Sequence, residues 1–173
     1  SNKALELFPS DGDLMAGQAQ AQCRMGDLKK AHALCDGALR QRGQSAYRWL
    51  VRGEVMVANR QDMDRPCFDK AQEVDSDWLI PLEASLIYLF YRLPTKAYQR
   101  AKVAVESAPD AYHAWYIQGM SQLQVGLDSA AQASFNRCLE LCPRHANAES
   151  RLAELQQPQW PFLRAFRRFI RRP

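Results

Sequence analysis

Two cysteines have a spacing that could hold a metal ion. Cys138 and Cys142 are four residues apart, so on a helix their thiols would be neighbours, and paired thiolates are common zinc ligands. No histidine or acidic side chain is spaced to complete a tetrahedral site with them. The chain has five cysteines, all within stretches of helical periodicity: Cys23, Cys35, Cys67, Cys138 and Cys142. We therefore expect buried free thiols, no metal site and a reducing compartment, the cytoplasm.

Other groups that could support catalysis are scattered along the chain. His32, His113 and His145 fall on three different predicted elements, and each is expected to be a surface or packing residue. Asp62 and Asp64 could bind a metal ion as a carboxylate cluster, but they lie where a helix begins, and its positive end favours such charges. The sequence contains no glycine-rich phosphate loop, nucleophile elbow or Ser/His/Asp arrangement. It therefore predicts no catalytic residue, no cofactor and no enzyme activity.

Positive charge is concentrated in residues 158–173. The whole chain has 23 basic and 19 acidic residues, a net charge of +4, and this segment holds five of the basic ones and no acidic one. Residues 1–157 are left with 18 basic residues against 19 acidic ones, a net charge of −1. At about 100° per residue, the arginines fill one arc of a helix and apolar side chains fill the other. The apolar set is Phe162, Leu163, Ala165, Phe166, Phe169 and Ile170, and the basic set is Arg164, Arg167, Arg168, Arg171 and Arg172.

A regular pattern of helices precedes this segment, and it is clearest in residues 112–145. Apolar residues recur at i, i+3 and i+4 in two stretches, 111–125 and 128–141, which predicts two amphipathic helices. Pro143 ends the second helix, because proline lacks an amide donor and clashes with the preceding turn. Six characteristic residues occur in this unit: Trp115, Gly119, Ala131, Phe135, Cys138 and Pro143. The small residues would allow the two helices to approach closely, and the ring of Phe135 would fill the space between them.

The same pattern recurs with a constant period along the chain. Counting back one period from Pro143 reaches Pro109, and counting forward one period from Pro9 reaches Gly43. Residues 78–111 place small residues at the corresponding positions: Ser85, Ala97, Ala101 and Ala104. Residues 12–45 do so with Ala19, Ala31, Cys35 and Ala38. Residues 46–77 are two residues short and lack the proline, and here Arg65 falls near the position where the second helix needs a small residue.

These units resemble the tetratricopeptide repeat (TPR), a helix pair with a period of about 34 residues. The resemblance covers residues 12–145 and implies an all-α fold, an antiparallel helix-pair solenoid (TPR superhelix). Four repeats are predicted, at residues 12–45, 46–77, 78–111 and 112–145, followed by a capping helix at 146–157 and a C-terminal amphipathic basic helix at 158–173. Residues 4–9 match residues 138–143 in pattern. Residues 1–11 are therefore expected to hold a tag scar and the last turns of a truncated repeat, in a fragment of a longer protein.

The resemblance also implies where a partner would bind. TPR proteins bind partners on the concave surface formed by the first helix of each repeat, and the predicted groove is lined by Leu50, Glu54, Leu82, Leu86, Leu89, Tyr116, Met120 and Leu123. Chaperone-binding TPR domains carry a clamp of lysine and asparagine there, which this sequence lacks. It predicts instead a non-catalytic scaffold that binds an apolar or amphipathic peptide or helix. Two alternatives are that the three leucines of residues 82–89 pack between repeats, and that the repeats regulate an enzyme or signalling protein encoded upstream.

The basic segment allows several further roles. It could cap the exposed end of the solenoid. It could lie on an anionic membrane surface, which would make the protein a membrane-peripheral adaptor. It could also occupy the groove of its own chain or of a second copy, giving self-association. The residues expected to act in the membrane or partner contact are Phe162, Arg164, Phe166, Arg167, Arg168, Phe169, Arg171 and Arg172. Nucleic acid is not the expected partner, because the rest of the chain is near neutral.

Overall fold

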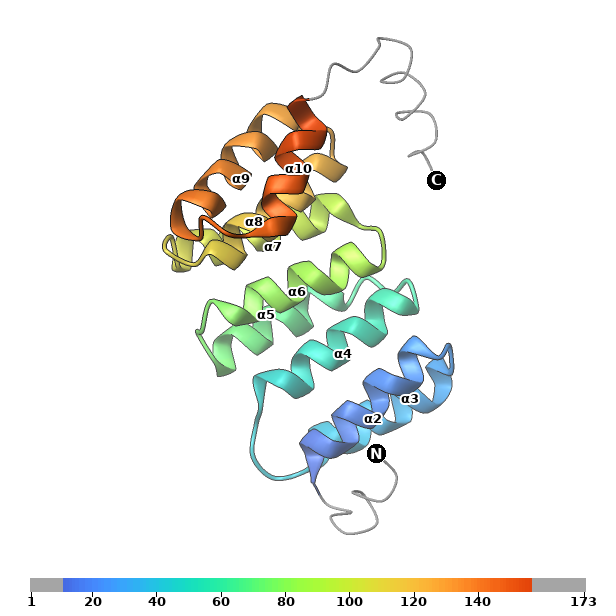
Figure 1. The fold of residues 1–173 in the computed structure, drawn as a ribbon. Coiled ribbons are helices and arrows are strands. Elements are labelled where there is room, and N and C mark those ends of the chain that lie inside the picture. The colour runs from blue at the N-terminus through green and yellow to red at the C-terminus, as the bar shows by residue number, and fades with distance from the viewer. Residues whose placement is uncertain (1–10, 157–173) are drawn as a thin grey trace.

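The computed structural model describes residues 11–156, which form helices joined by short turns (Figure 1). The helices are α2 (Gly12–Arg24), α3 (Leu28–Arg40), α4 (Ala46–Ala58), α5 (Asp64–Val74), α6 (Leu79–Phe90), α7 (Pro94–Ser107), α8 (Tyr112–Gln124), α9 (Asp128–Leu141) and α10 (Ala146–Gln156). These bounds lie close to the predicted ones, and the expected all-α fold is confirmed. The basic segment 158–173 and most of residues 1–11 lie outside the described residues. None of the described helices is long and apolar enough to cross a membrane.

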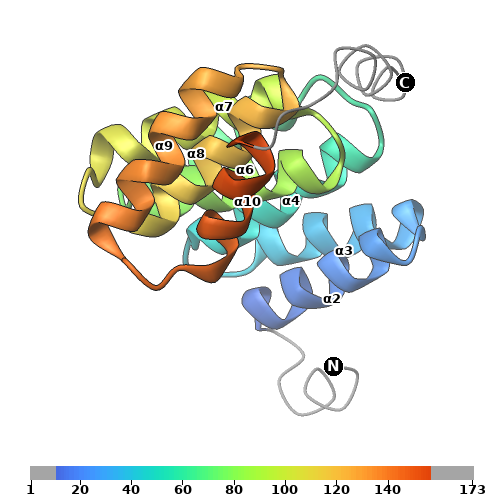
Figure 2. The same cartoon turned by 45° about the horizontal axis from the view of Figure 1, so that its top comes forward.

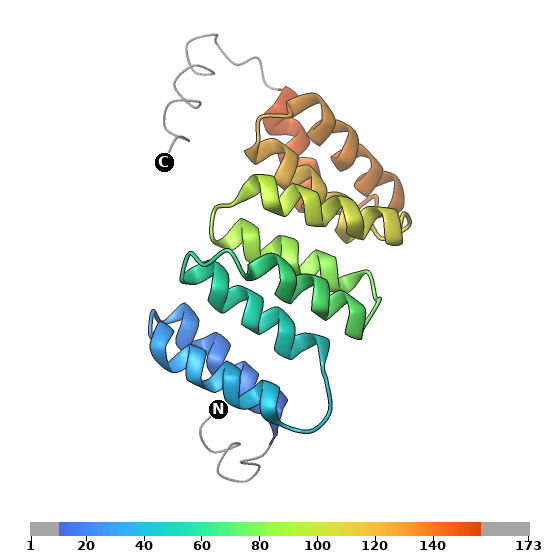
Figure 3. The same cartoon turned by 180° about the vertical axis from the view of Figure 1, so that it is seen from behind.

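The helices stack as antiparallel pairs in chain order (Figures 1 and 3). The pairs are α2 with α3, α4 with α5, α6 with α7, and α8 with α9. The first helices α2, α4, α6 and α8 also contact one another in sequence, whereas each second helix contacts the first helix of the following pair. The first helices therefore form one row, which we call the first-helix row, and the second helices lie behind it. This is the arrangement of a helix-pair solenoid.

The same turn closes every pair. It places a residue with positive φ at Gly26, Arg60, Arg92 and Gly126, each close to one repeat length from the next. After each of them an amide reaches back to a carbonyl of the last helical turn, as in Asp27 N to Gln22 O at 3.0 Å and Leu127 N to Gln122 O at 2.9 Å. Glycine adopts this conformation without a Cβ penalty, and the two arginines adopt it at some cost in strain. The step from Arg60 to Arg92 is two positions shorter than the other two steps, which locates the shortened repeat between these arginines.

The small residues allow close contact within each pair, as predicted. A Cβ added to Gly119 would lie 2.6 Å from Cε1 of Phe135, and one added to Gly53 would overlap the ring of Phe68. In the second helices, buried residues recur with spacings of four and three: Ala31, Cys35 and Ala38; Ala97, Ala101 and Ala104; Ala131, Phe135 and Cys138. In α5 this spacing selects Asp64, Phe68 and Ala71, all buried.

Arg65, expected near the small-residue position, is exposed, and the buried residue at that position is its neighbour Asp64. One residue is missing between Arg60 and Asp64 compared with the other pairs, so α5 begins one turn late. It has 11 residues, against 13 in α3 and 14 in α7 and α9. The shortened repeat thus carries a carboxylate where the other repeats have alanine.

Candidate functional site

α6 lies in the first-helix row near the middle of the molecule (Figure 1; Figure 2 shows the same row from a second direction). It carries large exposed apolar side chains. Leu79, Leu86 and Phe90 are 45%, 37% and 60% exposed. Their spacing of seven and four residues places them on one side of the helix. We call these three residues the α6 stripe. Tyr47 of α4, also in the row, is 39% exposed. Contiguous exposed apolar side chains in a soluble protein often mark an interaction site.

Two of the predicted groove residues are not available to a partner. Leu50 and Leu82 are 7% and 6% exposed. Leu50 packs with Ile87 and Tyr88, and Leu82 packs with Val105 and Ala114, so both lie between repeats. At about 100° per residue, Leu82 and Leu89 point about 60–80° away from the centre of the α6 stripe. The prediction placed α6 in the first-helix row, where the structure has it, but Leu82 and Leu89 are turned toward the core, whereas Leu86 is exposed.

The predicted groove residues of α8 are engaged by the following helix. Tyr116, Met120 and Leu123 are half-buried and pack against a core that includes Leu152 of α10. The ring of Tyr116 also lies 4.7 Å, centroid to centroid, from that of His145. Leu89 of α6 is half-buried against the core as well. The exposed large apolar side chains of the first-helix row are therefore those of the α6 stripe and Tyr47 of α4, and α10 covers much of the α8 part.

Glu54, predicted to line the groove, is completely buried and belongs to a network that sequence reasoning missed. Its carboxylate accepts hydrogen bonds from Gln20 Nε2 at 2.6 Å and from Arg24 Nε and Nη2 at 2.7 and 3.3 Å. The hydroxyl of Tyr91 donates to it at 3.4 Å. The Arg24 guanidinium also lies over the Phe90 ring, 5.3 Å from its centroid. Glu54 therefore holds Arg24 at one end of the α6 stripe. Gln20 and Glu54 lie one repeat length apart, which is the sequence signal that could have suggested this contact.

Charge is sparse on the open part of the row. Glu83, exposed between Leu79 and Leu86, is the one Asp, Glu, Lys or Arg residue within α6 and α8. The charged residues of α2 and α4 are paired instead: Arg24 with Glu54 at 2.7 Å, Arg48 with Asp13 at 2.8 Å, and Arg52 with Asp36 of α3 at 2.5 Å. The α6 stripe thus lies in an apolar surface with one negative charge and without a lysine or arginine from α6 or α8.

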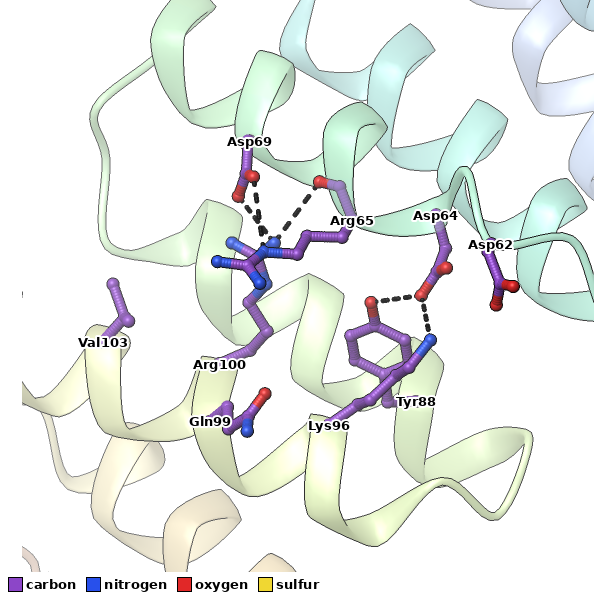
Figure 4. A pocket seen from close by; sticks show the side chains of 9 residues that line it. All are labelled: Asp62, Asp64, Arg65, Asp69, Tyr88, Lys96, Gln99, Arg100 and Val103. Carbon is purple, nitrogen blue, oxygen red and sulfur yellow. Dashed lines mark hydrogen bonds and ion pairs between the residues drawn. The ribbon is translucent and has the colours of Figure 1, made fainter.

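A second candidate site is a cavity of about 510 Å³ between α5 and α7 (Figure 4). Asp64 lies on one side of it, where its carboxylate accepts hydrogen bonds from the Tyr88 hydroxyl at 2.6 Å and from Lys96 Nζ at 2.8 Å. Burial alone would raise the pKa of this carboxyl, but the hydrogen bonds from Lys96 and Tyr88 outweigh burial and lower it.

On the other side of this cavity, Arg100 Nη2 donates to Asp69 at 2.7 Å and Arg65 Nε lies 3.8 Å from the same carboxylate. Each cation of the cavity, Lys96, Arg65 and Arg100, is therefore already paired with an acidic residue of α5. These contacts join the second and third helix pairs. The cavity is therefore a polar part of the interface between two repeats. It contains no unpaired positive charge that could bind a ligand.

The groups first considered for metal chemistry have structural partners. No cluster of three or more histidine, cysteine or acidic residues suited to a metal ion occurs within residues 11–156. Four of the five cysteines are buried, and burial raises the pKa of Cys35 to about 12 and that of Cys138 to about 11, so both stay protonated. His113 and His145 come together, with ring centroids 6.2 Å apart, which the sequence did not reveal. His145 Nδ1 accepts a hydrogen bond from the Ala148 amide at 3.1 Å, so this imidazole caps α10.

Known structures share this architecture. A thermophilic TPR protein of Thermus thermophilus is 18% identical with a TM-score of 0.62, over 89% of this chain and 86% of that one. YrrB, a TPR protein with an unusual peptide-binding site, is 20% identical with a TM-score of 0.56, over 86% of this chain and 78% of that one. The first TPR domain of Spaghetti (RPAP3), bound to the HSP90 peptide SRMEEVD, is 20% identical with a TM-score of 0.55, over 66% of this chain and 92% of that one.

These likenesses confirm the predicted resemblance at the level of the fold: the chain has the fold of TPR domains. Comparison of the sequence with models of protein families and with curated proteins finds no match.

Proposed function

We propose that the protein is a non-catalytic scaffold whose α6 stripe binds the apolar face of an amphipathic helix from a partner protein. The observation that supports this most directly is the exposure of Leu79, Leu86 and Phe90 on one side of a helix in the first-helix row. The stripe runs the length of α6, about 16 Å along the helix axis. That length matches three turns of a partner helix with apolar side chains at i, i+4, i+7 and i+11.

The charges around the stripe favour an apolar or basic partner over an acidic one. The Spaghetti TPR domain binds an HSP90 peptide that ends in the acidic sequence EEVD. In this chain α6 and α8 supply no lysine or arginine to pair with such a peptide, and Arg24 is already held by Glu54. An acidic peptide would lose its hydration without a compensating cation. We place the protein in the cytoplasm, where its free thiols would remain reduced.

The test is the substitution Leu86→Glu, with Val103→Glu as its matched control. Leu86 is 37% exposed on α6 and Val103 is 36% exposed on α7, behind the first-helix row, so both changes add the same charge at equal exposure. Binding of a fluorescein-labelled amphipathic helix of four turns, with leucines on one face and lysines on the other, is followed by fluorescence anisotropy. Leu86→Glu is expected to weaken binding at least tenfold, and Val103→Glu to change it less than twofold.

Circular dichroism of both variants shows whether the fold is kept. Leu86 is more than a third exposed, so the melting temperature should change by only a few degrees. Equal loss of binding in the two variants would contradict the proposed surface, since only one of them changes it. A large loss of stability in Leu86→Glu alone would place this side chain in the core and would also contradict the proposal.

A further inference from the structure

The α6 stripe is exposed among residues 11–156, and the chain itself contains a segment with complementary chemistry. We propose that residues 158–173 of the same chain bind across the α6 stripe and block it until a partner displaces them. This inference rests on the proposed function, because it identifies the competitor for the same surface. Three independent features of the described residues and of the sequence support it: the spacing of apolar side chains, the charge, and the distance to be covered.

Both segments have apolar side chains spaced to fall on one side of a helix. On α6 the exposed residues are Leu79, Leu86 and Phe90, seven and four residues apart. In the basic segment Phe162, Phe166 and Phe169 are four and three residues apart, which on a helix also places them on one side. Two such stripes can interdigitate, because each presents bulky side chains about one or two turns apart. Burying three phenylalanine rings and the stripe together removes a large apolar area from water.

The charges of the two surfaces are complementary. Glu83 lies within the exposed face of α6, is itself exposed, and has no hydrogen-bond or ion-pair partner among residues 11–156. The basic segment carries five arginines and no acidic residue. At about 100° per residue, Arg167 and Arg172 border its apolar arc, where either could reach Glu83 when the arc faces α6. Because α6 and α8 contain no lysine or arginine, no positive charge of these helices repels the arginines of the basic segment.

The basic segment can reach the stripe. α10 packs on the core beside Tyr116 of α8, and α8 contacts α6, so α10 is about two helix positions from the stripe. Neighbouring helix axes lie about 8–10 Å apart, which gives a distance of about 20 Å. Six Cα-to-Cα steps separate Gln156 from Phe162 and span up to about 20 Å when extended. The segment therefore reaches the stripe when its linker is extended, and because it belongs to the same chain its binding would not depend on protein concentration.

The experiment uses the full chain and compares two probes by fluorescence anisotropy. One is the amphipathic four-turn helix described above, and the other is a labelled peptide with the sequence of residues 158–173. A variant with Phe162, Phe166 and Phe169 all changed to serine removes the apolar arc but keeps all five arginines. This variant is expected to bind both probes at least tenfold more tightly than the wild-type chain, because its surface is open. Adding Leu86→Glu to this variant is expected to abolish that gain.

A second variant tests the charge contact. Glu83→Lys should weaken the contact with the basic segment and raise the binding of an uncharged version of the amphipathic probe at least threefold. Glu106→Lys is the control, since Glu106 lies on α7, is exposed and pairs with Lys102 instead. The backbone amides of α6 should exchange their hydrogens more slowly in the wild-type chain than in the serine variant. Light scattering should show that the wild-type chain is a monomer.

The outcomes separate the two proposals. If the serine variant binds the probes but no better than the wild-type chain, the blocking segment is refuted and the proposed function stands. If neither chain binds the amphipathic helix, the proposed function is refuted as well. A wild-type dimer that dissociates in the serine variant refutes binding within one chain. If the serine substitutions abolish flotation with phosphatidylserine vesicles and leave probe binding and exchange unchanged, the apolar arc faces a membrane and the proposal is wrong.

Discussion

Asp64 is a charged residue at a position where the other repeats have alanine. Ala31, Ala97 and Ala131 are fully buried at the corresponding point of their second helices, and Asp64 is 2% exposed. A buried carboxylate is tolerated only when it is paired and hydrogen-bonded. Tyr88 and Lys96, both of the following repeat, supply these contacts at 2.6 and 2.8 Å. A single polar residue therefore ties the shortened repeat to its neighbour.

The contacts of Asp64 predict a dependence of stability on pH. Its pKa is lowered in the folded protein, because the hydrogen bonds from Lys96 and Tyr88 outweigh the effect of burial. A lowered folded-state pKa stabilises the protein above the unfolded pKa of about 3.9, and this contribution is lost as pH falls through the folded value. We expect Asp64→Asn to lower the free energy of unfolding by roughly 1–2 kcal/mol at pH 7, a modest figure because Lys96 is partly exposed.

Urea unfolding of both proteins at pH 7, 5, 4 and 3 measures this difference, which should shrink below about pH 4 as the wild-type carboxyl becomes protonated. Asp62→Asn is the control, because Asp62 is an exposed neighbour in the same turn, and it should change the free energy of unfolding by less than about 0.5 kcal/mol. A difference between wild type and Asp64→Asn that is the same at every pH would show that the charge of Asp64 is not what stabilises this contact.

Single polar residues were the least predictable feature of the sequence. Glu54 was expected to line the groove, and the structure buries it beneath Arg24 and Gln20, both of the preceding repeat. Asp64 was expected only to favour a helix end. In both cases the partners lie on a neighbouring repeat, so the contact becomes visible only when the repeats are stacked in space. Apolar spacing along one helix carries no information about such pairs.

Whole helices were predictable because their ends are marked locally. Asp27 accepts a hydrogen bond from the Lys30 amide at 3.1 Å, and Asp77 accepts one from the Leu79 amide at 2.8 Å, as acidic residues at helix starts commonly do. Pro94 opens α7 at a position where no amide donor is needed. The exception is α5, whose first turn is missing. In α5 the buried residue is Asp64, one position before Arg65, near which the sequence pattern predicted it.

The fit between the two helices of a pair predicts an effect of adding one methyl group. Gly119→Ala would place a Cβ 2.6 Å from the Phe135 ring, which is fully buried and cannot easily move aside. We expect a loss of about 1–3 kcal/mol in the free energy of unfolding, because extra volume in a packed core forces side chains and backbone to shift. Chemical unfolding followed by far-ultraviolet circular dichroism measures it.

Gly17→Ala is the control for this change. Gly17 also lies within a first helix, but its added Cβ would meet only the Tyr47 hydroxyl at 3.5 Å, an ordinary contact. Alanine favours helix over glycine, so this variant should be unchanged or more stable by up to about 1 kcal/mol. Equal destabilisation by both substitutions would mean that the α8–α9 contact is not as close as the structure has it.

At the scale of the molecule, the sequence predicted which helices form the first-helix row but not how each is rotated. The repeat pattern placed α6 in this row and Leu86 on its surface, as the structure has them, yet it also assigned the buried Leu82 to the surface. Leu82 and Leu89 lie about 60–80° around α6 from the centre of the α6 stripe, and the rotation that turns them inward depends on how neighbouring pairs pack. The α10 contact with Tyr116 was likewise missed, since a capping helix contacts whichever residues the last complete repeat leaves uncovered.

The junction between the second and third pairs should govern whether the solenoid unfolds as one unit. Tyr88 is 2% exposed and belongs to one core cluster with Leu50 and Phe68 of the second pair. Its ring meets that of Phe68 edge-on with centroids 5.2 Å apart, and its hydroxyl donates to Asp64 at 2.6 Å. In a solenoid, stability is a sum of repeat terms and nearest-neighbour interface terms. Loss of this one side chain therefore weakens the coupling between two halves that each retain their own core.

We expect Tyr88→Ala to cost about 3–5 kcal/mol and to separate unfolding into two steps. Hydrogen exchange at increasing urea concentration, read for α2–α4 and for α8–α9, should then give two midpoints where the wild-type chain gives one. Tyr88→Phe is the control: it removes only the hydroxyl, should cost about 1–2 kcal/mol and should keep a single midpoint. A destabilised Tyr88→Ala protein whose two halves still unfold at one urea concentration would show that the coupling between repeats comes from other contacts along the first-helix row.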